Sequence, residues 1–251
     1  MTILALEPAV STHTGLVRSH NEDSVYASPR LVAVADGVGG AAAGEVASAA
    51  VIDQLILLDK CRLNGSLATA LEGAVSSGNA SVGFISHCCP ETAGMSTTVT
   101  AVAVADDNYA IGNLGDSRAY LLRDGSLTRL TRDDSYVQEL IDSGALDEEA
   151  ARTHPQRSVV TGALDGQPNR RPTMSVAPAR AGDRLLLCSD GLTDLVDEAA
   201  VRCALLETSA RVAAQTLVDL ALDAGGKDNV SVVVADVTAT TDASKGWVTA
   251  D

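Results

Sequence analysis

The sequence predicts an α+β fold in which antiparallel strands form the centre and helices pack outside them. From Ser96 onward the apolar residues have a period near two and short turns separate the segments, as is typical of an antiparallel meander. Before and after this region, apolar residues recur at helical spacing in two pairs of consecutive segments. This order of elements argues against a doubly wound parallel sheet.

The N-terminal half is expected to contain one buried strand followed by two helices. Leu31–Ala35 has no polar residue, which suits a strand that is buried on both faces. Helical spacing follows in residues 44–60, and again from the suitable N-cap Ser66 to about residue 86. Two consecutive helices after a strand would cover one face of a sheet. The polar segment 12–23 is expected to be an exposed loop or an edge strand.

The C-terminal half is expected to contain a polar insertion and a second set of strands and helices. Residues 133–152 have a helical pattern with a break at Gly144. Residues 153–171 contain prolines, glycines and arginines with weak periodicity, as a mobile surface insertion would. A buried strand, two helices and a last buried strand are then predicted at 184–188, 197–207, 209–224 and 230–237.

Length and composition fit one large domain. The chain of 251 residues can bury a sizeable core, and we expect residues 1–237 to form the domain and the polar tail 238–251 to be disordered. Hydrophobic residues make up 46% of the chain but aromatic residues only 2%, so aliphatic side chains must fill the core. The formal net charge of -15 disfavours nucleic acid and anionic membranes as partners and favours cations.

The sequence also predicts a cytoplasmic protein without a membrane segment. The N-terminus has no basic region of the kind that begins a signal peptide, and no apolar run approaches about 20 residues. The five cysteines are an odd number without C-x-x-C spacing, so we interpret them as reduced thiols and not as a zinc site.

Three aspartates stand at the ends of buried strands. Asp36 follows the first buried strand and precedes Gly37, where a side chain would block access to the backbone carbonyl. Asp190 has the same position after a second apolar strand, and Asp228 precedes the last strand, which can bring it to the same sheet edge. Asp-Gly is also a common turn sequence that occurs four times here, so only the repetition at three strand ends predicts a site.

Carboxylates gathered at one sheet edge stay ionised only if positive charge lies among them. Oxygen ligands without clustered histidine or cysteine favour Mg²⁺ or Mn²⁺ over zinc or copper. If one aspartate bridges two such ions, the ions can lower the pKa of a shared water and stabilise an in-line displacement at phosphorus. Arg18 would then bind the two phosphate oxygens that are not attacked.

These motifs resemble those of the metal-dependent, type-2C (PPM) protein serine/threonine phosphatases, in their bacterial form. The shared motifs R-x-x-x-E-D, A-D-G-x-G-G, G-D-S-R, S-D-G and D-N extend over about residues 10–236. In this chain they begin at Arg18, Ala35, Gly115, Ser189 and Asp228. The resemblance implies a four-layer αββα fold, a central β-sandwich of two antiparallel sheets with helices outside both.

By this resemblance, the chain holds two core ions of Mn²⁺ or Mg²⁺. Asp36 would bridge both ions, and the backbone carbonyl of Gly37 would bind one of them. Asp190 and Asp228 would complete the shell of the other ion. Glu22 would contact the site through metal-bound water.

The resemblance also implies that Arg18 holds the phosphate and that about residues 134–166 form a flap over the site. Eukaryotic members have a histidine after Asp-Gly that is proposed as the general acid, whereas this chain has Val38, which leaves proton donation to metal-bound water or a flap group. His13 is a second difference, because bacterial members usually have an aspartate at this position.

A third, more weakly bound ion is predicted at Asp116, which interrupts two apolar strands in the middle of the meander. In a sandwich, the meander would place Asp116 beside Asp190 on the side that faces the flap. The resemblance implies a third Mn²⁺ or Mg²⁺ there, sometimes closed by a flap serine, which would be Ser158 in this chain. The alternative is that Asp116 only shapes a β-bulge.

The predicted function is metal-dependent hydrolysis of phosphoserine and phosphothreonine in proteins by a monomer that reverses bacterial Ser/Thr kinase signalling. Its expected partners are phosphoproteins, namely Ser/Thr kinases and their substrates. Dephosphorylation of anti-sigma-factor antagonists is an alternative that the sequence does not separate from this one. A non-catalytic pseudophosphatase would have lost a site residue, but the three aspartates and Arg18 are present. A calcium-binding structural protein would be expected to carry an EF-hand loop, which the sequence lacks.

Overall fold

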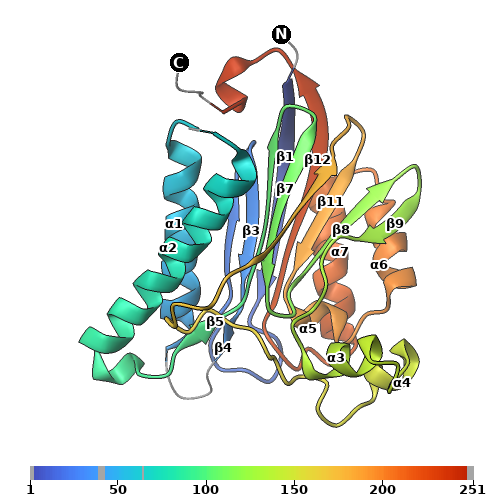
Figure 1. Cartoon of the computed structure of the whole chain (residues 1–251). Helices are drawn as coiled ribbons and strands as arrows, with labels where there is room; N and C mark the ends of the chain where they lie inside the picture. Colours follow the sequence, from blue (N-terminus) through green and yellow to red (C-terminus); the bar gives the residue numbers. More distant parts are fainter. Residues whose placement is uncertain (1–2, 39–42, 64, 248–251) are drawn as a thin grey trace.

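The structure, a computed structural model of the chain, describes residues 3–38, 43–63 and 65–247. Two five-stranded antiparallel sheets pack face to face, and helices cover both outer faces (Figure 1). The first sheet has the strand order β1-β12-β11-β8-β9, and the second has the order β10-β7-β6-β3-β2. This arrangement confirms the predicted four-layer αββα sandwich.

The strands of both sheets are short to medium in length. The first sheet consists of β1 (Ile3–His13), β8 (Arg118–Arg123), β9 (Ser126–Arg129), β11 (Arg184–Cys188) and β12 (Val230–Thr240). The second consists of β2 (Ser24–Ala27), β3 (Leu31–Ala35), β6 (Val99–Ala105), β7 (Asn108–Leu114) and β10 (Thr173–Pro178). A separate two-stranded pair is formed by β4 (Gly37–Val38) and β5 (Ser96–Thr97).

The helices divide into two outer layers and two short helices between them. The outer layers are α1 (Gly44–Lys60) and α2 (Leu67–Cys88) on one side, and α5 (Asp190–Thr193), α6 (Glu198–Leu205) and α7 (Ala210–Asp223) on the other. The segment that the sequence analysis predicted to be a flap carries the short helices α3 (Tyr136–Asp142) and α4 (Glu148–Arg152), and 3-10 turns occur at Pro90–Thr92 and Ala243–Lys245. Among the helices in the described parts of the chain, none has the length and apolar character to cross a membrane.

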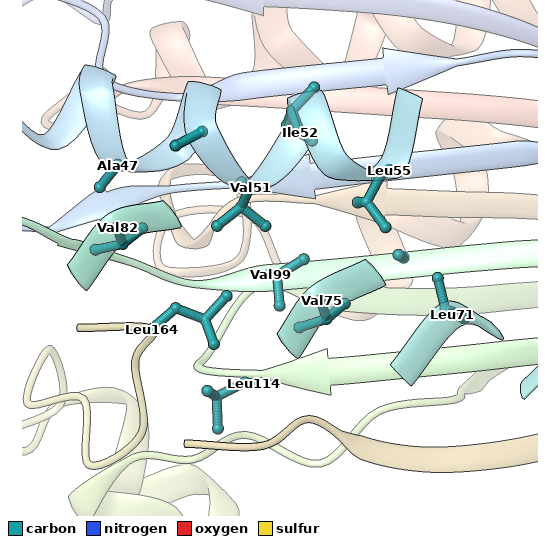
Figure 2. Packing of buried hydrophobic residues seen from close by; sticks show 14 of the residues in the cluster. Ala47, Val51, Ile52, Leu55, Leu71, Val75, Val82, Val99, Leu114 and Leu164 are labelled. Atoms are coloured by element: carbon teal, nitrogen blue, oxygen red, sulfur yellow. The ribbon is translucent and has the colours of Figure 1, made fainter. Parts of the chain in front are cut away.

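β3 is buried on both faces, as its uniformly apolar sequence predicts. Successive side chains of a strand point to opposite faces. Leu31 and Ala33 therefore pack under α1 and α2, while Val32 and Val34 pack between the two sheets. Figure 2 shows the helical side of this packing, in which aliphatic side chains of α1 and α2 meet residues from β6, β7 and the flap segment, among them Val51, Leu55, Val75, Val99, Leu114 and Leu164.

The predicted meander is divided between the two sheets. β6 and β7 form a hairpin in the second sheet, whereas β8 and β9 form a hairpin in the first. The chain crosses from one sheet to the other between Leu114 and Arg118, so Asp116 lies in a crossover and not in a β-bulge. A period of two predicts a strand but does not say which sheet the strand joins.

The structure differs from the predicted disorder of the tail 238–251. β12 continues to Thr240 because β1 pairs with it along its whole length. Trp247 then packs on the second sheet, where its indole Nε1 donates to the Val104 carbonyl at 2.8 Å and its ring centre lies 5.3 Å from the Arg30 guanidinium. Residues 248–251 lie outside the described residues.

We expect Trp247→Ala to lower the free energy of unfolding by about 2 kcal/mol, because it removes a partly buried ring and a hydrogen bond to the sheet. Urea unfolding measured by circular dichroism would test this. The matched control is Leu57→Ala, because Leu57 is more than half exposed on α1. Equal stability of the Trp247 variant and the parent protein would show that the tail does not stabilise the domain.

Candidate metal and phosphate site

The three predicted aspartates belong to one edge of the sandwich, where β4 and α5 lie low in Figure 1. Asp36 directly follows β3, and Asp190 begins α5 two residues after β11 ends. β12 is antiparallel to β11, and the Ser189 amide donates to the Ser231 carbonyl at 3.1 Å, so the start of β12 lies beside the end of β11. Asp228, two residues before β12, is thereby brought to the same edge.

Burial and mutual repulsion define the electrostatics of this edge. Burial raises the pKa of Asp36 well above its usual range, and the charges of Asp23 and Asp190 raise it further. Burial also raises the pKa of Asp190, and the charges of Asp116 and Asp194 add to the effect. Each carboxylate therefore disfavours the ionisation of the others, and a cation bound among them would favour the ionised forms.

Two carboxylate oxygens support the fit of a metal ion. Oδ1 of Asp23 and Oδ1 of Asp190 are buried, and neither has a hydrogen-bond partner in the described part of the chain. A buried carboxylate oxygen without a partner is unfavourable unless a donor or a cation reaches it. Oxygen donors of this kind suit Mg²⁺ or Mn²⁺.

The carboxylates do not by themselves close a metal shell. Among residues 3–38, 43–63 and 65–247, no group of three histidine, cysteine, aspartate or glutamate side chains has the arrangement of a complete site. A divalent ion at this edge would therefore take further ligands from backbone carbonyls and water, as Mg²⁺ usually does.

Hydrogen bonds fix the backbone of Asp36. Its amide donates to Thr98 Oγ1 at 3.0 Å, and its carbonyl accepts from the Thr98 amide and from Thr97 Oγ1, both at 2.9 Å. At the next position, a Cβ on Gly37 would lie 2.5 Å from the backbone of Gly44, the first residue of α1. Glycine is therefore required where β4 passes under the start of the helix. Gly39 and Gly40, the last glycines of this motif, lie outside the described residues.

Arg18 contacts the site through Asp228. Its guanidinium NH2 lies 2.7 Å from Asp228 Oδ2, and about half of the Arg18 side chain is exposed. The hydrogen bond and the charge of Asp228 raise the pKa of Arg18, so the guanidinium stays ionised. The structure thus brings together two residues that the sequence separates by 210 positions.

Glu22 lies at the start of α1. Its carbonyl accepts a hydrogen bond from Ser48 Oγ at 2.6 Å, and its amide donates to Asn229 Oδ1 at 2.8 Å. A side chain on Gly44 would collide with Glu22 Oε2, so the carboxylate is next to the N-terminus of the helix. The positive end of the helix dipole favours a carboxylate in this place.

Asp23 and Asn229 belong to the site although the sequence analysis assigned them no role. Burial raises the pKa of Asp23 to about 6, and Ser189 Oγ donates to its Oδ2 at 2.9 Å. Asn229 Nδ2 donates to the carbonyls of Thr14 and His20, each at 2.8 Å, which ties the Arg18 loop to the start of β12. Asp23 directly follows Glu22, and Asn229 directly follows Asp228, so their position next to predicted site residues was the feature of the sequence that could have indicated them.

A cleft of about 430 Å³ opens beside the aspartates, under the flap. Asp116, Asp190 and Asp194 line it together, so the structure places Asp116 beside Asp190 on the side that faces the flap. Burial raises the pKa of Asp116 to about 7, and the charges of Asp133 and Asp194 contribute. Asp194 was not predicted, although it follows Asp190 by four residues and so lies one helical turn further on.

Two other predicted positions differ in their contacts. Ser158 is exposed in a turn of the flap and does not line the cleft, whereas its neighbour Arg157 does and lies 3.5 Å from Asp194. The His13 ring accepts a hydrogen bond from the Gly15 amide at 2.9 Å through Nδ1. His13 therefore closes a local turn in the way that an aspartate carboxylate could.

Comparisons with known proteins agree with this geometry. The family described as Protein phosphatase 2C matches residues 17–224. The chain is 49% identical over 234 residues to the serine/threonine protein phosphatase PstP of Mycobacterium tuberculosis, which covers 93% of this chain and 45% of that protein. The chain therefore spans less than half the length of PstP. It is 34% identical over 238 residues to the serine/threonine phosphatase stp of Listeria monocytogenes, covering 90% of this chain and 93% of the relative.

Solved structures give the same result. The crystal structure of M. tuberculosis PstP/Ppp superposes with a TM-score of 0.89 at 48% identity, covering 92% of this chain and 98% of that chain. The catalytic domain of PstP in complex with 2 manganese ions superposes with a TM-score of 0.88 at 46% identity, covering 94% of this chain and 99% of that chain.

The chain has the sandwich and the carboxylate edge of a class of proteins that includes bacterial serine/threonine phosphatases, to which it is similar in sequence and fold. Within that class, the chain belongs to the protein phosphatase 2C family. It is similar to PstP of M. tuberculosis over nearly its whole length.

We expect Asp36→Asn to raise the thermal unfolding midpoint of the metal-free protein by about 5 °C, since it removes one of several buried carboxylates that repel each other. Manganese should raise the midpoint of the parent protein and have a much smaller effect on the variant. Differential scanning fluorimetry in EDTA and in manganese measures both effects. If the variant unfolded at a lower temperature than the parent protein in EDTA, repulsion between the carboxylates would not be the main effect that destabilises this edge.

Proposed function

We propose that the chain hydrolyses phosphoserine and phosphothreonine in proteins and so counteracts bacterial Ser/Thr kinases. The observation that carries this proposal is the meeting of buried, partnerless carboxylate oxygens with one half-exposed arginine at the same edge of the sandwich. Carboxylates that suit divalent ions, beside a guanidinium that suits phosphate, are the combination that phosphoester hydrolysis requires. Membership of the protein phosphatase 2C family supports the same reaction.

The proposal assigns the ion ligands to the strand-end aspartates. Asp36 would bridge two Mn²⁺ or Mg²⁺ ions, the Gly37 carbonyl would bind one of them, and Asp190 and Asp228 would bind the other. Glu22 would contact this centre through water. Bound divalent ions supply Lewis acidity that lowers the pKa of a water molecule and offsets the charge of the phosphate.

Arg18 is proposed to bind and orient the phosphate. Its guanidinium already lies at the edge, where the Asp228 carboxylate holds it through one hydrogen bond, and a phosphate would offer it two acceptors in a forked geometry. The Asn229 amide fixes the loop on which Arg18 lies. Val38 has no proton to donate, so the leaving alkoxide must receive its proton from water or from a group on the flap.

A third ion is proposed at Asp116. Asp116, Asp190 and Asp194 share the cleft under the flap, and burial makes ionised Asp116 unfavourable without a cation. Few protein ligands and several waters imply weaker binding than in the core. Ser158 remains the low-priority candidate to close this site, because a movement of the flap would be needed to bring it into the cleft.

The substrates and partners of the protein in the cell are also proposals. Ser/Thr kinases and their substrates are the proposed partners, and anti-sigma-factor antagonists are the alternative substrates. The boundaries of the catalytic domain and of the flap at about residues 134–166, the monomeric state and the cytoplasmic location stay predictions.

Hydrolysis of an aryl phosphate and of a phosphothreonine peptide, each with manganese, magnesium or EDTA, tests the proposed activity. We expect turnover with manganese and none in EDTA. Asp36→Asn and Asp190→Asn should each lower kcat at least about a thousandfold, because each removes a charge that binds ions while the shape is kept. Asp53→Asn is the control, since Asp53 is exposed on α1. A parent protein that is inactive with every metal would refute the activity.

Asp116→Ala tests the third ion. We expect the variant to keep its fold and the two core ions, to turn over phosphopeptide at least about tenfold more slowly, and to need more metal. Isothermal titration calorimetry with manganese should show one ion fewer in the variant than in the parent protein. Equal stoichiometry in both would contradict a third ion. A joint loss of thermal stability and aryl phosphate activity would show that Asp116 only shapes the crossover.

A further inference from the structure

Two loops that are far apart in the sequence are joined beside Arg18. We call the rim formed by Leu16, Val17 and Lys227 on these loops the lip. The Leu16 amide donates to the Gly226 carbonyl at 2.7 Å, which joins the two loops. Gly15 has a φ of 83°, and a side chain there would collide with the Asp228 carbonyl, so the loops pack backbone against backbone.

The lip presents apolar surface to solvent next to the phosphate-binding residue. Leu16 and Val17 are 65% and 70% exposed, although both are large aliphatic residues. Their loop is held in place by hydrogen bonds at Leu16, His13 and Asn229, so the exposure does not come from a loose segment. Two adjacent exposed aliphatic side chains on a fixed loop offer a small apolar patch on which a partner can pack.

Lys227 adds a positive charge to the same rim. It is exposed, and none of the ion pairs among the described residues includes it. The formal net charge of the chain is -15, so an acidic phosphoprotein is repelled over most of the surface. Arg18 is paired with Asp228, so Lys227 is the cation of the lip that no ion pair among the described residues neutralises, and it can attract an acidic residue of a bound peptide.

We propose that the lip is the surface on which the polypeptide of a phosphoprotein lies next to its phosphorylated residue, and that it favours apolar and acidic residues there. The inference rests on the proposed function, because it assumes that Arg18 binds the phosphate. Val17 directly precedes Arg18 on the same loop, and an extended peptide advances about 3.4 Å per residue. A peptide that continues for a few residues past a phosphate bound to Arg18 is therefore long enough to reach Val17.

The occupant follows from the reaction and not from the apolar surface alone. A protein substrate has to continue past the phosphorylated residue on at least one side, and the lip is continuous with the residue that binds its phosphate. An aryl phosphate has no polypeptide and ends at the site. A change in the lip should therefore alter the hydrolysis of phosphopeptides but not that of an aryl phosphate, whereas a change in the chemistry should alter both.

The experiment compares kcat/KM for an aryl phosphate with kcat/KM for phosphothreonine peptides that carry leucine, glutamate or serine on both sides of the phosphothreonine. For Val17→Ser, we expect the ratio of the leucine peptide to the aryl phosphate to fall about fivefold, with little change in the ratio for the serine peptide. For Lys227→Gln, the preference for the glutamate peptide over the serine peptide should fall about threefold and should weaken with salt.

Phe84→Ser is the matched control, because Phe84 is also 70% exposed but lies on α2, outside the lip. It should leave every ratio unchanged. If Val17→Ser lowered the rates for all substrates by the same factor, or left the ratios unchanged, the lip would have no role in substrate choice. A parent protein that hydrolysed neither kind of substrate would refute the proposed function itself, and the inference with it.

Discussion

The repulsion among buried carboxylates at one edge of the sandwich is the constraint on which the rest of the structure depends. Asp36 and Asp190 are fixed there by buried strands whose side chains fill the core, so they cannot move apart without unpacking it. Their raised pKa values show that the fold opposes their ionisation. Arg18 offsets part of the negative charge through Asp228, and oxygen-seeking cations are suited to offset the remainder. The packing of the sheets thus determines the chemistry of the edge.

The sequence was sufficient to predict the aspartates that end buried strands, because an apolar run, a carboxylate and a glycine form a local signal. It was not sufficient for Asp23 and Asp194, which do not end an apolar strand and become site residues only through burial and the charges around them. Asn229 was missed for a related reason. Its three side-chain hydrogen bonds reach residues more than 200 positions away, and no local pattern records such contacts.

The fold shows the same limit. The central strands and the long helices were predicted closely, since buried elements have strong periodicity. The sequence analysis did not predict β10 or most of β1, which are edge strands with mixed polar and apolar residues. The sequence analysis also did not predict that the meander divides between the two sheets at Asp116, because the sheet that a strand joins depends on the packing of the whole core. Similarly, the packing of Trp247 depends on Arg30 and on the Val104 carbonyl of β6, which come together only in the folded chain.

The joining of the first and last strands has a consequence for synthesis of the protein. Among the described strands, β1 pairs with β12 alone, and Arg18 contacts Asp228 across 210 positions, so the edge is incomplete until nearly the whole domain has been synthesised. The β2–β3 and β6–β7 pairs of a nascent chain can form earlier, because the strands of each pair are adjacent in the sequence. The same chain still lacks Asp228 and Asn229. The carboxylate edge is therefore completed only when translation of the domain is almost finished, and a product truncated before β12 would lack it.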